Sequence, residues 1–335
     1  MNADRWQGEK VLVTGATGFI GAHLARRLAS YGATVIAFAR NPRGITGKGI
    51  QAFQGDISDP SAVCRAMGDC QTVFHCAGHI SFRRSELPAS LRINVDGTQN
   101  VLAACAAAKV RAVVHLSACA TLGYGRNART LLDESAYPNI PQANVYAYTK
   151  KLAEDIAVSY AAKGLPVSIA NIATVYGSGD THMNSGSIIK SVRRGIAAMP
   201  PGGTSFVAVS DLIDGLIAQA EKGRQGERYI FCTENLEYRA LISRIAGVVG
   251  ARPPKMAIPR IARLPLMLIA RCIEAVTPSN SNRVNLLTVQ IVKELFGYKY
   301  YNSNKARNDL GWRPQMSLES AVSEAYRYYT QNGLI

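Results

Sequence analysis

The chain contains 335 residues, of which 47% are hydrophobic and 18% charged. At roughly 150 residues per domain, this length predicts about two domains with a large buried core. The seven cysteines include no C-x-x-C pair and the five histidines are dispersed. This pattern argues against a disulfide framework or zinc site, so we expect a reduced protein without a metal.

The formal net charge is +15, from 38 lysines and arginines against 23 aspartates and glutamates. Nucleic-acid binding must therefore be weighed. No nucleic-acid-binding motif accompanies the charge, so we favour a basic surface with sites for an anionic cofactor or substrate. The first ten residues lack the apolar core of a secretory signal, and the longest apolar stretches are shorter than the about 20 residues that cross a bilayer. We expect a cytoplasmic protein that is soluble or lies on a membrane surface.

Short apolar runs alternate with helical patterns along the first half of the chain. The first run, residues 10–14, reads Lys-Val-Leu-Val-Thr and ends at a glycine-rich turn, which is typical of a buried parallel strand. Further strands are predicted over 34–39, 52–54, 72–76, 112–117 and 167–171, and helices over 23–31, 61–67, 91–108 and 146–163. This alternation predicts an α/β fold, a Rossmann-type doubly wound parallel sheet.

The alternation of strand and helix patterns becomes less regular after about residue 176. A helix is predicted over 186–195, and strands that return to the core over 206–211 and 228–232. From about residue 236 the pattern is mainly helical, with proline breaks. We therefore predict a Rossmann domain formed by 1–176 plus 206–232, and a smaller, mainly helical C-terminal substrate domain formed by 177–205 plus 233–335.

A glycine-rich motif follows the first strand and opens the first helix. It reads Gly15-Ala-Thr-Gly18-Phe-Ile-Gly21. Glycines permit a tight turn and let the backbone approach a pyrophosphate, while the helix N-terminus supplies amide donors. The alternative is a mere strand–helix turn. We predict a nicotinamide dinucleotide site whose first contacts are Gly15, Thr17, Gly18, Phe19, Ile20 and Gly21.

The end of the second predicted strand bears on cofactor choice. NAD-selective folds commonly place an acid there for the ribose hydroxyls, whereas a 2′-phosphate favours a cation. This chain has Arg40 and Arg43 and no acid. We therefore prefer NADP(H) to NAD(H), with Arg40 as the phosphate ligand, although solvated arginines remain an alternative. Asp56 follows the third strand and either accepts from the adenine amino group or caps a helix.

Tyr146 and Lys150 are the candidate catalytic pair. Four residues apart on a predicted helix, they share one face. A nearby ammonium favours the phenolate and should lower the phenol pKa from its usual value near 10. Tyr146 would then exchange a proton with an alcohol or carbonyl while hydride moves to or from the nicotinamide.

At this point the chain resembles an extended short-chain dehydrogenase/reductase of the NAD-dependent epimerase/dehydratase family. Within it, the chain resembles the branch with dihydroflavonol reductases, 3β-hydroxysteroid dehydrogenases and hopanoid-associated sugar epimerases. The resemblance covers nearly the whole chain and rests on Gly15-x-x-Gly18-x-x-Gly21, Gly55-Asp56, His75-Cys-Ala77, Asn94-Val-Asp-Gly97-Thr98, Tyr146-x-x-x-Lys150-x-x-x-Glu154, Val175-Tyr176-Gly177, Val209-Ser-Asp211, Gly226-Glu-Arg-Tyr229 and Leu310-Gly-Trp-Arg-Pro314.

The resemblance adds cofactor contacts and a third catalytic position. It implies that Ile57, Cys76, Ala77 and Ile172 lie along the cofactor, and that homodimers through helix faces are frequent. It also implies a Ser or Thr that hydrogen-bonds the substrate oxygen.

This chain departs from the family at that third position, where Ala118 stands directly after Ser117. Successive strand residues face opposite sides, so Ser117 does not replace the missing hydroxyl automatically. We take Ser117 as the third catalytic candidate, with Cys119 and Thr121 as alternatives if the strand ends or bulges there. A second departure is Asn171-Ile172, where the family often has Arg-Pro. A third is Ser210, where it often has Asp.

Two basic segments concern the substrate. Arg83 and Arg84 either hold an anionic group or are solvated. Residues 260–283 combine apolar side chains with arginines, which predicts either a lid over the substrate pocket or a helix that lies on an anionic membrane.

Three functions follow from the sequence. The first is an NADP(H)-dependent oxidoreductase, a ketone or aldehyde reductase or a secondary-alcohol dehydrogenase, that acts on a fairly apolar small molecule. The second is a sugar-nucleotide epimerase or dehydratase with a tightly bound cofactor. The third, motivated by Ala118, is a weakly catalytic NADP(H)-binding sensor or scaffold.

Overall fold

A seven-stranded parallel sheet forms the centre of the larger part of the computed structural model, which describes residues 3–276 and 288–335. The strand order is β10-β6-β5-β4-β1-β2-β3, so the direction of winding reverses between β1 and β4. In open α/β sheets, ligands bind at such a switch point, outside the carboxyl ends of the strands. The strands are β1 (Lys10–Thr14), β2 (Thr34–Ala39), β3 (Ile50–Gln54), β4 (Thr72–His75), β5 (Ala112–Ala118), β6 (Val167–Ile172) and β10 (Arg228–Phe231).

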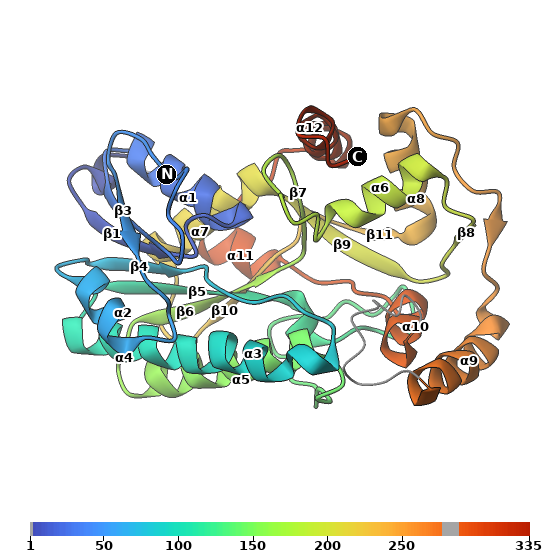
Figure 1. Ribbon diagram of the computed structural model, residues 1–335, viewed down its shortest axis with the longest axis horizontal. Coiled ribbons are helices and arrows are strands. Elements are labelled where there is room, and N and C mark those ends of the chain that lie inside the picture. Colours follow the sequence, from blue (N-terminus) through green and yellow to red (C-terminus); the bar gives the residue numbers. More distant parts are fainter. Residues whose placement is uncertain (1–2, 277–287) are drawn as a thin grey trace.

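Helices cover both faces of this sheet, which confirms the predicted doubly wound fold (Figure 1). Both faces need cover because the strands of a parallel sheet are apolar on each side. One face packs against α1 (Phe19–Ser30), α7 (Val209–Lys222) and α11 (Asn304–Asp309). The other packs against α2 (Pro60–Met67), α4 (Gly97–Ala108) and α5 (Val145–Ala162).

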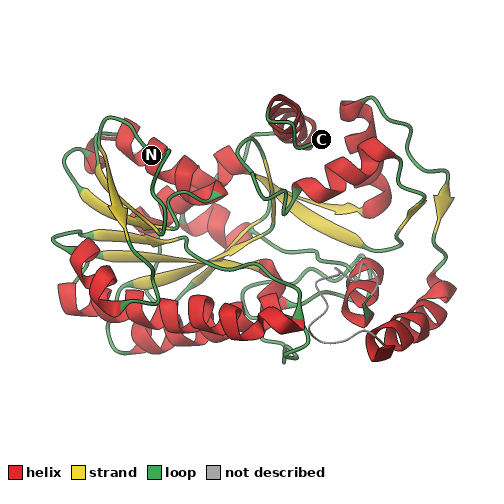
Figure 2. Cartoon of the chain, viewed as in Figure 1, coloured by secondary structure: helices red, strands yellow, loops and turns green. Residues whose placement is uncertain are grey.

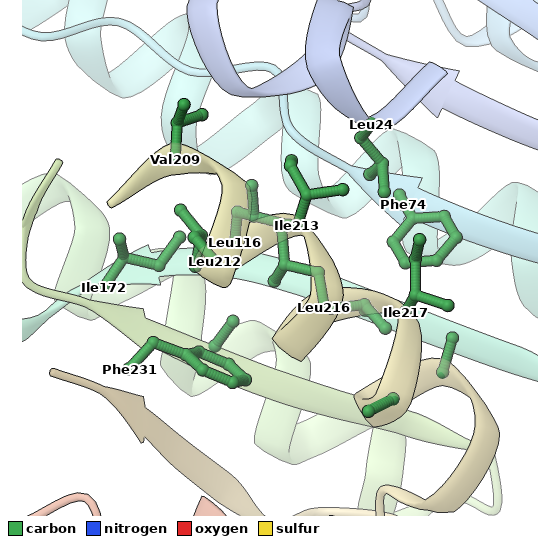
Figure 3. Packing of buried hydrophobic residues seen from close by; sticks show 14 of the residues in the cluster. Leu24, Phe74, Leu116, Ile172, Val209, Leu212, Ile213, Leu216, Ile217 and Phe231 are labelled. Carbon is green, nitrogen blue, oxygen red and sulfur yellow. The ribbon is translucent and has the colours of Figure 1, made fainter. Parts of the chain in front are cut away.

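Helix α7 fills the first of these layers. Figure 3 shows its apolar side chains directed at residues of the strands and of α1. Leu212 and Leu216 are fully buried and lie one turn apart, which places them on one face of the helix. Fully burying a leucine stabilises a fold by about 1.5–3 kcal/mol. The layer therefore holds the sheet rigid beneath the carboxyl ends of β5 and β6.

The smaller part of the molecule combines helices with two short sheets (Figure 2). A three-stranded sheet has the order β11-β9-β7, and β12 pairs with β8. The strands are β7 (Thr174–Tyr176), β8 (Ala198–Met199), β9 (Gly203–Ala208), β11 (Glu234–Glu237) and β12 (Met256–Ala257). The helices are α6 (Gly186–Arg194), α8 (Tyr238–Val249), α9 (Arg263–Val276), α10 (Val289–Phe296) and α12 (Leu318–Gln331).

Short helical turns complete the described chain. They are η1 (Ala3–Trp6), η2 (Arg84–Glu86), α3 (Leu87–Leu91), η3 (Arg92–Asp96), η4 (Cys119–Leu122) and η5 (Arg260–Ala262). The η3 turn is π-helical and joins α3 to α4, so the helix predicted over 91–108 begins earlier and carries a π turn. Such π turns are frequent at functional sites.

The strand predicted over 206–211 is wrong beyond Ala208. Val209 begins α7, and Asp211 in its first turn favours a helix start because the N-terminus is electropositive. The same strand, β9, joins β7 and β11 and not the large sheet. The domain boundary predicted at 206 therefore falls inside β9, and the division into two domains stays a prediction.

Over residues 3–276 and 288–335, no helix has the length and apolar character to cross a membrane. Within the same residues no group of three or more metal-binding side chains occurs.

Candidate active site

A cavity of about 1150 Å³ opens where the carboxyl ends of β1, β4, β5 and β6 meet residues of the smaller part. Ligand cavities usually measure about 300–1,000 Å³, so this one has room for a dinucleotide and a second molecule. The structure brings the predicted cofactor contacts and the three main catalytic candidates to its wall, although their individual roles stay predictions. They are Gly15, Thr17, Gly18, Phe19, Ile20, Gly21, Arg40, Asp56, Ile57, Cys76, Ala77, Ser117, Tyr146, Lys150 and Ile172.

The glycine-rich loop leaves no room for side chains. Gly15 has φ +64°, and a Cβ there would lie 2.7 Å from the Ala77 Cα. A Cβ on Gly21 would lie 2.3 Å from the Gly15 carbonyl oxygen. The N-cap of α1, Gly18, provides no side-chain hydrogen bond. The first amides of α1 have no intrahelical acceptor and fit an anionic pyrophosphate.

The structure separates the two arginines after β2. Arg40 is exposed and lines the cavity, whereas Arg43 is exposed and does not line it. Asp56 also lines the cavity, and its Oδ1 accepts from both the amide and the hydroxyl of Ser58. Although burial raises the pKa of Asp56, the hydrogen bonds from Ser58 and the nearby cations Arg92 and Arg40 hold it below its usual value. Asp56 is therefore an ionised acceptor that caps a turn while facing the cavity.

A buried hydrogen-bond chain fixes the end of β4 beneath the cavity. The Thr14 hydroxyl accepts from the Ala77 amide at 3.2 Å and lies 2.8 Å from His75 Nδ1. His75 Nε2 lies 3.0 Å from the Thr98 hydroxyl, which itself donates to the Asn94 carbonyl, so Nε2 must donate. Burial lowers the pKa of His75 to about 3, with Lys150 contributing, so the imidazole is neutral at pH 7. Its unprotonated Nδ1 therefore accepts from the Thr14 hydroxyl.

The candidate catalytic pair lies at the start of α5, on one helix face. Asn144 caps this helix by accepting from the Ala147 amide. Tyr146 and Lys150 both line the cavity, and Lys150 Nζ donates to the Leu116 carbonyl at 2.5 Å. Burial lowers the pKa of Lys150 to about 8, opposed by Glu154.

The pKa of Tyr146 differs from the sequence expectation. Burial raises the pKa of Tyr146 to about 12, and the Cys119 thiol adds to the rise. Desolvation is the largest effect on this pKa, and Lys150 is not among its causes, so the expected lowering is not seen. At neutral pH the phenol is therefore a proton donor and not a phenolate.

A buried carboxylate accepts hydrogen bonds from the hydroxyl groups near Ala118, the third catalytic position. Glu154 is fully buried, and its Oε1 accepts from Ser117 at 2.5 Å, Thr121 at 2.7 Å and Asn171 at 2.7 Å. Arg228 Nε lies 3.2 Å from Oε2 of the same carboxylate. The network explains the departure at Asn171, whose amide completes it. In this network the Ser117 hydroxyl donates its hydrogen bond to Glu154.

Ala118 places a methyl group where the resemblance implies a hydroxyl. Ala118 ends β5 and lines the cavity. Cys119 also lines it, but its thiol donates to the Asn171 carbonyl, and burial raises its pKa well above the usual range. A neutral buried thiol is a poor nucleophile. The catalytic role assigned to Ser117 stays a prediction.

The fold adds cavity residues that sequence reasoning missed. Phe82 lies edge-on to Tyr146, with ring centroids 5.9 Å apart. Helix α10 and the strand-like segment after it contribute charged and polar groups, and no local signal links them to Tyr146 because only the tertiary fold brings them close. Arg83 and Arg84 are exposed and are not part of the cavity wall. The added residues are Gln290, Lys293, Glu294 and Lys299.

Comparisons with known proteins agree with this geometry. Residues 11–232 match the model of the NAD dependent epimerase/dehydratase family. Sterol demethylase protein B of Methylococcus capsulatus is 27% identical, over 97% of this chain and 99% of that protein. A ketoreductase of Stigmatella aurantiaca, named for 4-hydroxy-2-methyl-3-oxo-4-farnesyl-3,4-dihydroquinoline-1-oxide, is 27% identical over 93% of this chain and 94% of that protein.

Solved structures with a similar fold include members of the same kind. The crystal structure of gox2253 has a TM-score of 0.84 at 26% identity, covering 97% of this chain and 99% of that chain. MoeE5, solved in complex with UDP-glucose and NAD, has a TM-score of 0.74 at 25% identity, covering 97% and 100%. The chain belongs to the NAD dependent epimerase/dehydratase family. It is an NAD(P)-dependent oxidoreductase of the extended short-chain dehydrogenase/reductase type.

Proposed function

We propose that this protein is an NADPH-dependent reductase that converts a ketone on an apolar small molecule to a secondary alcohol. The observation that carries the proposal is one cavity that joins the glycine-rich loop and Arg40 to a half-buried, protonated Tyr146.

A protonated Tyr146 can supply the proton that ketone reduction requires. A carbonyl oxygen that gains electron density needs a proton, and a neutral phenol supplies one. When bound, the dinucleotide supplies the hydride. Lys150 anchors to the Leu116 carbonyl and presents a cation beside the site. Ala118 contributes no donor, so Tyr146 carries the hydrogen bond to the substrate oxygen largely alone.

The residues around Tyr146 support an apolar substrate. Phe82 and Ile80 both line the cavity and are 65% and 43% exposed, so apolar surface lies at the cavity mouth. Exposed apolar surface beside a cavity is typical of a binding site for an apolar ligand. Two relatives are named for a sterol and for a farnesyl-bearing 3-oxo compound. We infer the same broad class, an alicyclic or alkyl ketone, for this chain.

Arg40 supports the preference for NADPH. Its guanidinium is exposed, lines the cavity and forms no hydrogen bond or ion pair within the described part of the chain. β2 ends at Ala39, so no acid stands at this strand end to bind ribose hydroxyls. The 2′-phosphate of NADPH would give the Arg40 guanidinium an anionic partner.

A sugar-nucleotide epimerase is the second candidate. Lys293 and Lys299 line the cavity and offer cations to a diphosphate, and MoeE5 was solved with UDP-glucose. However, Lys299 Nζ already lies 3.5 Å from the Glu294 carboxylate, which offsets part of that charge.

One experiment separates these functions. Purified protein is incubated with NADPH and, in turn, 3-oxosteroids and 2-alkyl-3-oxoalkanoates, and separately with NAD⁺ and UDP-glucose, because an epimerase first oxidises its substrate. The redox state of the cofactor and the product are followed together. The proposal expects one NADPH oxidised per ketone reduced. Conversion of UDP-glucose without net change in the cofactor would establish the epimerase instead, and cofactor binding without turnover of any compound would favour a sensor or scaffold.

A further inference from the structure

Helix α9 and the turn before it expose a row of large apolar side chains. Ile261 is 86% exposed, Leu264 71%, Leu268 66% and Ile269 51%. Leu264 and Leu268 are four residues apart, so they lie one above the other on one face of the helix. We call Ile261, Leu264, Leu268 and Arg271 the α9 face, and Ile269 lies beside it.

The opposite side of α9 is already packed. Ala270 is fully buried, and Leu266 and Met267 pack with it against Val292 and Phe296 of α10. The exposed leucines are therefore not part of the contact between α9 and α10. In Figure 1, α9 lies at an outer corner of the molecule, away from the large sheet.

Cations accompany the α9 face. Residues 251–273 contain five of them and no acid. Arg271 lies seven residues after Leu264 and three after Leu268, so it shares their face. Arg260 is engaged with the Tyr298 hydroxyl, but Arg252, Lys255, Arg263 and Arg271 form no ion pair within the described residues.

We propose that the α9 face docks on an anionic lipid bilayer. A helix with apolar side chains on one face and arginines beside them lies in the membrane interface, and its cations attract anionic lipids. A second copy of this chain fits less well, because it carries the same +15 charge and would place arginine against arginine. Of the segment predicted for membrane contact, 260–283, residues 277–283 lie outside the described residues.

Docking through this face would bring the cavity close to the membrane. Helix α10 packs on α9 with Val292 and Phe296, and the same helix lines the cavity with Lys293 and Glu294. One helix thus separates the α9 face from the substrate. If the proposed function holds, the ketone is a membrane-soluble molecule that enters from the lipid side.

Vesicle co-sedimentation tests the docking without measuring activity, so its result is independent of the proposed function. The protein is mixed with vesicles of phosphatidylcholine alone or with phosphatidylglycerol added, at low and high salt. We expect pelleting only with the anionic vesicles, and weaker pelleting at high salt because salt screens the charges. Joint replacement Ile261→Ser, Leu264→Ser and Leu268→Ser, and separately Arg271→Glu, should each weaken binding by at least about tenfold.

Matched controls are available on remote helices. Val158→Ser on α5 removes an apolar side chain that is 41% exposed, and Arg327→Glu on α12 reverses an exposed cation. Both should bind vesicles like the wild type, and thermal melts check that every variant folds. The proposal is overturned if the wild type does not pellet with anionic vesicles, or if the α9 variants pellet like the controls. It is equally overturned if sedimentation velocity shows a dimer that the triple variant abolishes.

Discussion

The ring of Phe82 stands edge-on to the ring of Tyr146, with centroids 5.9 Å apart and planes at 65°. Phe82 is 65% exposed, so an aromatic side chain in contact with the candidate proton donor is also a surface residue. This relationship places apolar contact area for a substrate directly beside the phenol, and it leads to the first prediction.

Phe82→Ala should raise KM for an apolar ketone by about tenfold and change kcat little, because an aromatic contact contributes about 0.5–1.5 kcal/mol beyond its area. Steady-state kinetics with NADPH in excess measure both constants. Phe82→Leu, which keeps apolar bulk, should recover much of the lost affinity. An unchanged KM in Phe82→Ala would remove this residue from the substrate site.

Arg40→Ser should raise KM for NADPH by about 10–100-fold and leave KM for NADH nearly unchanged, since charge-assisted hydrogen bonds contribute about 1.5–3 kcal/mol. The matched control is Arg43→Ser, because Arg43 is exposed but does not line the cavity. Equal effects on the two cofactors, or a larger effect from the control, would contradict the assignment of Arg40 to a 2′-phosphate.

Two buried histidines should destabilise the protein in acid. Burial lowers the pKa of His75 to about 3 and that of His115 well below its usual value, with Lys150 contributing to both. Between about pH 6.5 and pH 3 the unfolded chain therefore binds protons that the folded protein excludes, so stability falls as pH falls. At about 1.4 kcal/mol per unit, His75 costs about 2 kcal/mol between pH 7 and pH 5, and His115 adds a loss of the same sign.

His115→Leu tests this account because neither ring nitrogen of His115 has a hydrogen-bond partner within the described residues. Urea unfolding should show equal or greater stability than the wild type at pH 7, and about half of the loss on going to pH 5. A variant that loses as much stability in acid as the wild type would show that other groups cause the effect.

Arg228→Met should lower the free energy of unfolding by about 3–5 kcal/mol, because it leaves the fully buried Glu154 carboxylate without its cation. The control is Arg224→Met, which breaks an ion pair with Asp309 at a side chain that is 64% exposed. Exposed pairs contribute about 0–1 kcal/mol. Similar losses in the two variants, measured by urea unfolding, would show that Glu154 does not depend on Arg228.

Much of the fold could be predicted from local patterns. The apolar runs of the parallel strands and the glycine-rich turn at Gly15 each depend on residues close in sequence. The doubly wound sheet can therefore be predicted from the sequence. The region 206–211 was misread because its apolar run crosses from β9 into α7 at Val209, and an apolar run alone does not distinguish a strand from a buried helix.

The site can be predicted from the sequence only in part, for the same reason. Tyr146 and Lys150 are linked by helical spacing, which a sequence displays directly. Glu154 shares that spacing, yet its contacts with Ser117 and Arg228 join α5 to two different strands, and no local pattern reports them. The sequence predicts a fall in the phenol pKa because it displays the Lys150 ammonium but not the desolvation of the Tyr146 phenol.

The measurement that tests the central claim most directly is the comparison of Tyr146→Phe with the wild type in ketone reduction and NADPH binding. Removing the proton donor should lower kcat by about 10²–10⁴-fold. The dissociation constant for NADPH, measured by fluorescence titration, should stay within about threefold, a change below about 0.7 kcal/mol. A variant that binds NADPH normally and still reduces the ketone at the wild-type rate would contradict the account.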